Sequence, residues 1–292
     1  MKKTTFLILT FFIIISFSLN GFANEDDILM DQVENNYDIP DQSGPVENLP
    51  WRNKEEFQDW KDKHNTPFLL AGFCAVLTDP LPGEEFNVKL ASEKISKYVI
   101  KPNQTFSQNS VLGPYDKDNG YKEGAAYTGG NVIMSEGGGV CKIAGTLYNL
   151  SVLSDLEIIE RHNHSMAINY LPHGQDATVA YGIKDFKFKN TTSDNILIWS
   201  QLIENRLYMG FYGAKPSPVV KWHHEVLDTK DKSTKYIKNE KLNSGEMNTI
   251  TNGLDGVTVK SIVDIEYMDG STSTRNMGIS QYNPLPKLIE IN

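Results

Sequence analysis

Apolar residues recur at every third or fourth position in two stretches of this chain. The first covers residues 87–99 and the second covers residues 141–153, and each predicts a helix with one apolar face. Upstream of both, residues 68–78 form a continuous apolar run that ends at Asp79-Pro80. A short run bounded by turn residues indicates a buried strand.

Beyond residue 155 the apolar residues alternate with polar ones, which is the period of a strand with one buried face. The tail from about Val219 continues in this way and contains an Asp269-Gly270 pair, a typical hairpin turn. Upstream of the tail, the alternation predicts short strands at residues 156–161, 166–170, 177–181, 186–188, 195–202 and 206–211. The pattern therefore predicts an α+β fold, in which an antiparallel sheet packs with the helix that begins at Cys141. A small β-rich appendage is expected at residues 219–292.

The first 50 residues are predicted to lie outside the folded core. Residues 1–23 begin with two lysines, continue with an apolar run and end in small residues, which is typical of a secretory signal. An uncleaved membrane anchor is the alternative, because the run is nearly long enough to span a bilayer. Residues 24–50 carry eight acidic residues and no Lys or Arg, which indicates a disordered linker. The main domain is expected at residues 51–214, in a protein that is secreted or attached to the cell envelope.

The net charge argues against some classes of binding partner. The chain has 28 Lys and Arg residues against 37 Asp and Glu residues, a formal charge of −9, which argues against a nucleic-acid-binding protein. Bulk charge would also not attract this protein to an anionic cell wall or to lipid head groups. We therefore expect any wall contact to be made by a specific site, and membrane contact only if the segment 1–23 stays uncleaved.

The strongest sign of chemistry is the run Gly137-Gly138-Gly139-Val140-Cys141, directly before the second predicted helix. Glycines allow backbone conformations with positive φ and close approach of other groups. A cysteine at the amino end of a helix is favoured as the thiolate, because the exposed N–H groups and the helix dipole attract negative charge. This pattern predicts Cys141 as a nucleophile.

A second cysteine leaves an alternative open. Cys74 and Cys141 are the two cysteines of the chain, and an exported pair can form a disulfide. A bonded Cys141 has no thiolate, so the disulfide and the nucleophile exclude each other. Cys141 is also a small apolar side chain of the kind that packs at the start of a helix.

His164 is the predicted base for Cys141, since it follows the cysteine by a little over twenty residues at a predicted strand end. Asp176 and Asp185 are the acids that would orient it, and we prefer Asp176 because it lies in the more motif-rich segment. The same region offers a second interpretation, a zinc site built from His162, His164, His173 and Cys141. Histidines two apart on a strand are common without metal, so no metal and no cofactor is expected.

The remaining candidate residues would bind substrate. Arg161 is suited to a bidentate contact with a substrate carboxylate, although an exposed Arg at a strand end is the plainer interpretation. Tyr121 would line a groove or pack within its own loop. The rest of the predicted binding set lies beside Cys141 and His164 and comprises Gly138, Gly139, Lys142 and Ser165.

Several collinear blocks in this region resemble the VanW family, which takes its name from a member of vancomycin-resistance gene clusters. They span about residues 100–212 and include Gly113-Pro114, Gly137-Gly138-Gly139-Val140-Cys141, Thr146-Leu147-Tyr148-Asn149, Glu160-Arg161-His162-Asn163-His164-Ser165 and Gly174-Gln175-Asp176-Ala177-Thr178-Val179. The resemblance implies an exported role at the cell envelope. Family members usually carry Gln directly after the cysteine, where this chain has Lys142.

Two functions from different classes follow. The first is a cysteine-dependent peptidase, amidase or acyl transferase that acts on peptidoglycan peptides, with Cys141 as nucleophile, His164 as proton shuttle and the backbone of residues 139–142 as oxyanion donor. The second is a non-catalytic envelope module that binds peptidoglycan or an envelope protein with the same groove. A buried or disulfide-bonded Cys141, or a remote histidine, would favour the second.

Overall fold

The computed structural model describes residues 37–78, 80, 83–128 and 131–292. The predicted secretory segment 1–23 and the first part of the predicted linker lie outside the described residues. Among the helices that are described, none is long and apolar enough to cross a membrane. The fold is α+β, as the alternation of apolar periods predicts.

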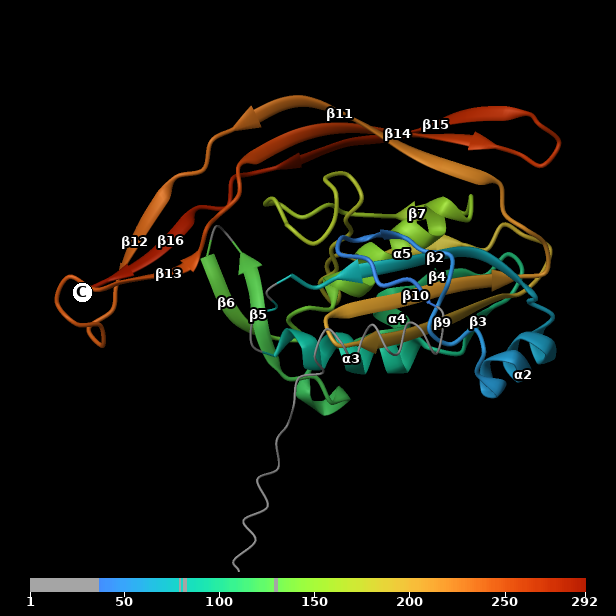
Figure 1. Ribbon diagram of the computed structural model, residues 1–292, viewed down its shortest axis with the longest axis horizontal. Helices are drawn as coiled ribbons and strands as arrows, with labels where there is room; N and C mark the ends of the chain where they lie inside the picture. The colour runs from blue at the N-terminus through green and yellow to red at the C-terminus, as the bar shows by residue number, and fades with distance from the viewer. Residues whose placement is uncertain (1–36, 79, 81–82, 129–130) are drawn as a thin grey trace, which may run out of the picture.

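The centre of the molecule is a five-stranded antiparallel sheet (Figure 1). Its strands lie in the order β1 (Gly44–Pro45), β2 (Phe68–Val76), β10 (Arg206–Gly213), β9 (Ile196–Ile203) and β3 (Tyr98–Ile100). Strand β2 is continuously apolar because both of its faces are covered. Phe73 and Ala75 point into one apolar cluster, while Cys74 and Val76 point into another on the opposite face.

Two helices cover the first face of the sheet. Helix α5 (Cys141–Leu153) packs on β2 and β10, and α3 (Glu84–Ile95) packs on β9. The apolar stripe of α5 predicts one buried face, but residues 142–152 are all buried, because the helix lies between the sheet and the strands that follow it in the chain. The apolar cluster on this face contains most of the buried hydrophobic residues that the structure describes.

The opposite face is covered by the segment before β2, which corrects the linker prediction for residues 37–50. Tyr37 and Leu49 are 3% and 1% exposed, and β1 pairs with β2. Trp51 is fully buried and donates its indole N–H to the Tyr212 hydroxyl at 2.9 Å. Helix α2 (Glu55–His64) adds Phe57 to the same cluster. The acidic residues of this segment are compatible with order because the apolar residues between them have a sheet face to cover.

Smaller elements lie at both ends of α5. A three-stranded sheet contains β4 (Thr105–Ser107), β8 (Lys187–Lys189) and β7 (Glu157–Glu160), while β5 (Glu123–Thr128) and β6 (Asn131–Glu136) form a hairpin. Between them lie α4 (Gln108–Leu112) and a short 3-10 helix, η1 (Lys117–Asn119). The predicted strands at 166–170 and 177–181 are wrong: these segments are loops with isolated bridges at Met166 and Ala180.

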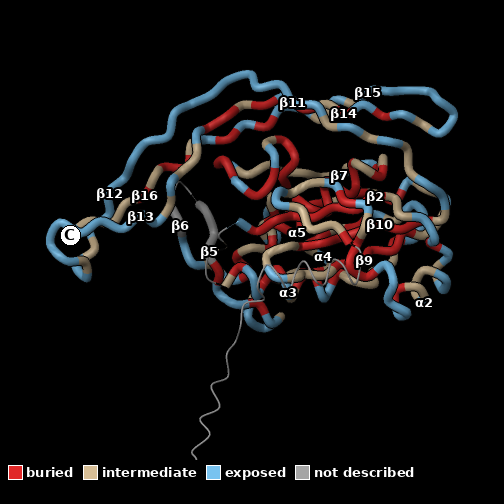
Figure 2. Tube along the Cα trace, viewed as in Figure 1, coloured by how far each residue is buried: buried red, intermediate tan, exposed pale blue. Residues whose placement is uncertain are grey.

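The tail forms two further sheets that arch over the central core (Figure 1). One contains β11 (Val219–Lys230), β14 (Gly256–Glu266) and β15 (Thr272–Tyr282), and the predicted hairpin turn at Asp269-Gly270 joins β14 to β15. The other contains β12 (Thr234–Lys238), β16 (Lys287–Ile291) and β13 (Met247–Thr251), with β12 and β16 parallel. Figure 2 shows buried residues concentrated in the core and exposed ones along this outer sheet.

The tail is attached to the core by apolar side chains. Val263 and Ile265 of β14 belong to the same buried cluster as α5, and Trp222 of β11 packs against it. The Trp222 ring meets Tyr148 of α5 with a centroid distance of 5.8 Å. The tail is therefore packed against the face of the molecule that carries the candidate site.

Candidate functional site

The glycine run forms a tight turn that leads directly into α5. Gly137 and Gly139 have φ values of 73° and 104°, a region that side chains with Cβ disfavour. A Cβ on Gly139 would also lie 3.0 Å from the carbonyl oxygen of Glu84. The buried Asn87 of α3 donates its side-chain N–H to Gly138 O at 2.9 Å and so holds the turn from the other side. Helix α5 then begins at Cys141, with Val140 as its N-cap residue.

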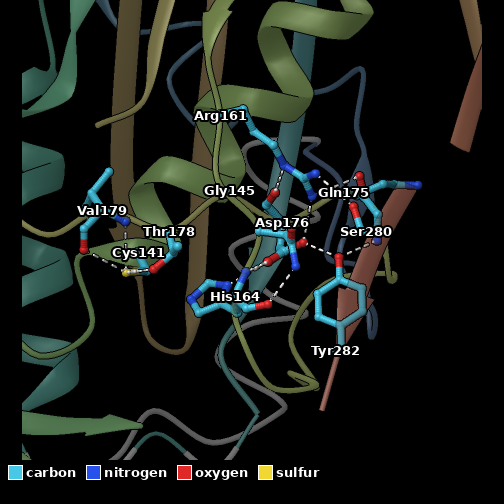
Figure 3. A network of polar contacts seen from close by, with 12 residues as sticks. Cys141, Gly145, Arg161, His164, Gln175, Asp176, Thr178, Val179, Ser280 and Tyr282 are labelled. Carbon is cyan, nitrogen blue, oxygen red and sulfur yellow. Dashed lines mark hydrogen bonds and ion pairs between the residues drawn. The ribbon is translucent and has the colours of Figure 1, made fainter. Parts of the chain in front are cut away.

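Three groups surround the Cys141 sulfur (Figure 3). The Thr178 hydroxyl lies 3.3 Å from it and the Val179 N–H donates to it at 3.5 Å. The His164 imidazole is the third group, and its interaction with the thiol lowers the pKa of Cys141. Hydrogen bonds from N–H and O–H groups favour the charged form of an acceptor. The surroundings of the sulfur therefore suit a thiolate.

His164 lies between the sulfur and a carboxylate. Its Nδ1–H donates to Asp176 Oδ2 at 2.6 Å, and its backbone N–H donates to the same oxygen at 2.7 Å. With Nδ1 committed to the aspartate, Nε2 is the ring nitrogen left for the thiol. Figure 3 shows the three side chains in this order. A nucleophile, a base and an acid that orients the base are the arrangement that activates cysteine hydrolases.

The three groups shift one another's proton affinities. Burial would raise the pKa of the Cys141 thiol, but the hydrogen bond and charge of His164 lower it to about 7. Burial would likewise lower the pKa of His164, and the contacts with Asp176 and Cys141 raise it to about 9. Burial opposes the ionised form of Asp176 as well, yet its contacts with His164 and Arg161 hold its pKa near 2. The favoured state between about pH 7 and about pH 9 is therefore a thiolate beside an imidazolium.

The second oxygen of Asp176 is bound by two further donors. Arg161 Nη2 lies 2.9 Å from Oδ1, and the Tyr282 hydroxyl donates to the same oxygen. Asp176 is 0% exposed, so its charge is matched entirely by protein groups. Arg161 also donates Nε–H to the Asp176 carbonyl oxygen at 2.7 Å.

A pocket of about 620 Å³ opens over the sulfur. Its walls include Cys141 and His164 together with four of the predicted binding residues, Gly138, Gly139, Lys142 and Ser165. Tyr115, Tyr170 and Tyr181 contribute aromatic rings to it, and Ile133, Met166 and Ile183 contribute apolar side chains. Polar and charged side chains such as Glu84, Asp116 and Lys184 also line it, and a concave site with aromatic, apolar and polar walls is typical of ligand binding.

The structure places the two other predicted binding residues away from this pocket. Arg161 lines a neighbouring cavity, and its guanidinium is bound to Asp176 and to Ser280. Tyr121 is 2% exposed and donates its hydroxyl hydrogen to Leu112 O at 2.9 Å, so it packs within its own loop. Neither side chain has a donor directed at the space above the sulfur.

Lys142 lies in the wall of the pocket as a buried ion pair. Its Nζ lies 3.0 Å from Glu84 Oε1, and both side chains are less than 10% exposed. The ammonium also lies 5.0 Å from the centre of the Tyr170 ring. The Tyr170 hydroxyl is buried and has no hydrogen-bond partner among the described residues.

Cys74 and Asp185, which two of the alternative interpretations would use, have other surroundings in the structure. Cys74 and Cys141 are free, and Cys74 lies on the far face of the central sheet, where burial raises its pKa to about 12. Asp185 accepts from Ser107 and from the Asn109 N–H, at the start of α4, and is not the acid beside His164. In the part of the chain that the structure describes, no group of three His, Cys, Asp or Glu side chains is placed to hold a metal.

Backbone donors beside the sulfur are fewer than the sequence predicts. The Val140 and Lys142 N–H groups donate to Gly137 O at 3.2 Å and Gly139 O at 2.9 Å. The Cys141 N–H, at the first position of α5, has no acceptor among the described residues. This N–H points from the amino end of a helix, where the dipole favours an anion.

Sequence reasoning missed four residues that shape the site. Thr178 lies in the same motif block as Asp176, so that block did contain a signal. Asn87 and Tyr170 have no such signal, because each reaches the site from a separate segment. Tyr282 lies in the run Tyr282-Asn283-Pro284, which resembles a region that flanks the core in the VanW family, but the run does not indicate a contact with Asp176.

Known proteins are similar to the middle part of this chain. Residues 83–212 match the family described as VanW like protein. The chain is 34% identical over 128 residues to the uncharacterized protein YoaR of Bacillus subtilis strain 168, across 44% of this chain and 42% of that protein. It is 32% identical over 127 residues to the vancomycin B-type resistance protein VanW of Enterococcus faecalis, across 42% of this chain and 46% of that protein. The match spans less than half the length of each of these relatives.

Two solved structures are similar to a smaller part. One is an IgA1 protease G5 domain, with 18% identity and a TM-score of 0.17, across 26% of this chain and 92% of that one. The other is HP0197-G5, with 13% identity and a TM-score of 0.15, across 26% of this chain and 99% of that one.

Proposed function

We propose that this chain, which carries a VanW-like domain at residues 83–212, is an exported cysteine-dependent peptidase, amidase or acyl transferase that acts on peptidoglycan peptides. The observation that carries the proposal is that Cys141 and His164 line one pocket and lower and raise each other's pKa, while the His164 ring donates to the buried Asp176 behind it. The envelope setting is supported by the secretory pattern of residues 1–23 and by the relative named for vancomycin resistance.

The proposed reaction begins with attack of the Cys141 thiolate on a peptide carbonyl. A C–S bond forms, the C–N bond breaks, and the imidazolium of His164 gives its proton to the departing amine. Water, or an acceptor amine in the transferase case, then attacks the thioester and gives a proton back to His164. The C–S bond breaks and the thiolate is restored. Asp176 keeps Nδ1 of His164 protonated in every step, which leaves Nε2 to carry the proton.

The oxyanion formed in both steps needs a donor near the sulfur. The Cys141 N–H fits this role because no described residue accepts it and because it lies at the amino end of α5. The neighbouring Val140 and Lys142 N–H groups are already bonded within the turn. The oxyanion site that we propose is therefore narrower than the whole stretch 139–142.

The test compares the chain from Asn24 onward with its Cys141→Ala variant on purified peptidoglycan. We expect fragment release by the wild type and none by the variant, with both proteins folded. Cys74→Ala is the matched control, since Cys74 is buried on the other face of the sheet, and this variant should release fragments as the wild type does. Equal release by wild type and Cys141→Ala would end the cysteine mechanism. No release by either, with both pelleting on the wall material, would support the binding module.

A further inference from the structure

The loops that carry His164 and Asp176 lie against the end of strand β15. Asn283 donates its N–H to Ser165 O at 2.8 Å and accepts from the Ala167 N–H at 3.2 Å. Asn163 donates its side-chain N–H to Gln281 O at 2.9 Å. The segment around His164 has no regular strand of its own, so the carboxyl end of β15 is its backbone partner.

The Asp176 carboxylate is held at both oxygens from different parts of the chain. Oδ2 accepts from the backbone N–H and the ring of His164, while Oδ1 accepts from Arg161 and Tyr282. A carboxylate anchored at Oδ1 cannot rotate about its terminal torsion without breaking those bonds. The donors on Oδ1 therefore decide which way Oδ2 points.

Tyr282 is itself fixed in direction. It is 2% exposed, and its hydroxyl oxygen accepts from the Gly174 N–H at 2.8 Å while its hydrogen goes to Asp176. Arg161, the other donor to Oδ1, is held from β15 as well, because its Nη1 donates to Ser280 Oγ at 2.8 Å. Figure 3 shows Ser280 and Tyr282 approaching Asp176 from the side opposite Cys141.

The junction is tight where the Asp176 loop meets the tail. Gly174 has a φ of 91°, and a Cβ at this position would lie 2.2 Å from the Ser261 Oγ of β14. His224 of β11 bonds to that same Ser261 hydroxyl at 2.9 Å and to the Gln175 side chain at 2.9 Å. Three strands of the tail thus contact the two residues that precede Asp176.

We infer that residues 280–283, at the end of β15, form a positioning element for the base and acid of the site, with Tyr282 as its positioning residue. This inference rests on the proposed function and assigns the tail a part in it. Cys141 is presented by the core helix, whereas His164 and Asp176 are oriented from the tail. The reactive arrangement therefore forms only where the two parts meet.

The inference predicts that a substitution at Tyr282, which does not contact the Cys141 sulfur, changes the reactivity of that sulfur. Tyr282→Phe removes one of two donors from Asp176 Oδ1 and the acceptor of the Gly174 N–H, but keeps the ring that packs on His173 at 5.3 Å. The carboxylate then gains freedom to turn, and His164 loses its fixed orientation toward the thiol. The other groups that face the thiol are unchanged by this substitution, namely Tyr115, Tyr170 and the Lys142–Glu84 pair.

The experiment measures alkylation of Cys141 by iodoacetamide as a function of pH, in the chain from Asn24 onward, with mass spectrometry to identify the peptide. We expect the midpoint for Tyr282→Phe to rise by roughly one pH unit, so that alkylation near pH 7 slows about fivefold. His164→Ala gives the upper limit of the shift. Tyr236→Phe, on the exposed strand β12, is the matched control and should leave the midpoint unchanged.

A folded Tyr282→Phe variant with the wild-type midpoint, or a lower one, would overturn the inference. If that variant does not fold by circular dichroism, Ser280→Ala replaces it, since it removes only the anchor of Arg161 and should shift the midpoint in the same direction by less. A shifted midpoint without fragment release by the wild type would reject the enzyme and retain the positioning element. Fragment release by the wild type together with an unshifted midpoint for Tyr282→Phe would support the enzyme and reject the positioning element.

Discussion

Asp176 combines full burial, a negative charge and four donors on two oxygens. A buried charge without partners destabilises the fold, and removing the carboxylate would leave its buried donors without an acceptor, which is destabilising as well. The stability of the fold and the proposed reactivity of Cys141 therefore both depend on Asp176, and separate measurements are needed to distinguish the two effects.

Asp176→Ala is expected to destabilise the protein by about 3 kcal/mol, because Arg161 and His164 would be left as buried donors without their acceptor. Urea denaturation followed by tryptophan fluorescence measures the change. Asp228→Ala, on an exposed position of β11, is the control and should stay within about 0.5 kcal/mol of wild type. A loss at Asp176 no larger than the control would mean that the network adds nothing to stability.

The thiolate–imidazolium pair predicts a bounded pH range for stability. A thiol whose pKa is lowered to about 7 on folding stabilises the fold at alkaline pH, and this contribution is lost as the pH falls through about 7. An imidazole whose pKa is raised to about 9 stabilises the fold at acid pH, and this contribution is lost as the pH rises through about 9. Both contributions coexist between these values.

We therefore expect the difference in melting temperature between wild type and Cys141→Ala to be largest between about pH 7 and about pH 9. Scanning calorimetry across pH 5–10 would measure it, with Cys74→Ala as the control. The difference for Cys74→Ala should be flat up to about pH 8 and change only above about pH 9, because the thiol of Cys74 then ionises in the unfolded chain while burial keeps its pKa at about 12 in the folded one. A difference that is flat across pH would show that the pair does not form.

At the scale of single residues, the sequence predicts which side chains have candidate chemical roles better than it predicts their hydrogen-bond partners. Cys141, His164 and Asp176 all lie in recognisable motifs, and the structure brings them together. Arg161 lies in the same motif and was expected to bind substrate, but its donors are taken by Asp176 and Ser280. A hydrogen bond across more than a hundred residues leaves no periodic trace in the chain, so the contact of Arg161 with Ser280 was not predictable.

At the scale of elements, the turn before α5 depends on residues without a side chain. Gly139→Ala should destabilise the protein by about 2 kcal/mol, because it adds a Cβ at a φ of 104° and 3.0 Å from Glu84 O. Gly182→Ala is the control that carries the φ of 74° with no atom within 4 Å of the added Cβ, and it should cost less. Equal losses in chemical denaturation would mean that contact with α3 is unimportant.

The segment before β2 should contribute to stability in proportion to what it buries. Leu49→Ala is expected to cost about 3 kcal/mol, since Leu49 is 1% exposed against the open face of the sheet. Leu227→Ala, with Leu227 at 47% exposure, is the control and should cost little. Denaturant midpoints compare the two, and a near-neutral Leu49→Ala would restore the linker interpretation for residues 37–50.

The spacing of apolar residues predicted strands well where the backbone pairs with a neighbouring strand. It predicted them poorly where the backbone hydrogen-bonds to loops or side chains instead. The buried run at 68–78 and the hairpin at Asp269-Gly270 are confirmed by β2 and by the turn between β14 and β15. The segments 166–170 and 177–181 also alternate, yet their N–H groups go to Asn283 O, His162 O and the Cys141 sulfur. Alternation reports which side chains are buried, and it does not report which acceptor each N–H finds.

At the scale of the whole molecule, burial predicts where the chain opens first. Every residue of β12 is exposed and β13 is nearly so, whereas β9 and β10 are mostly buried. Hydrogen exchange followed by mass spectrometry should show rapid exchange in β12 and β13 and the slowest exchange in β9 and β10. Strand β14 should be protected like the core, because Val263 and Ile265 belong to the core cluster. Uniform protection along the tail would contradict this.

The contact between Tyr282 and Asp176 also has a consequence for the order of events in synthesis. The two residues are 106 positions apart, so Cys141, His164 and Asp176 have all left the ribosome well before their support exists. On the positioning role that we propose for residues 280–283, a chain that lacks β15 carries an ordinary thiol and a loosely held histidine. The proposed reactivity of Cys141 would therefore arise only once the last strand of the tail has been synthesised and has packed on the core.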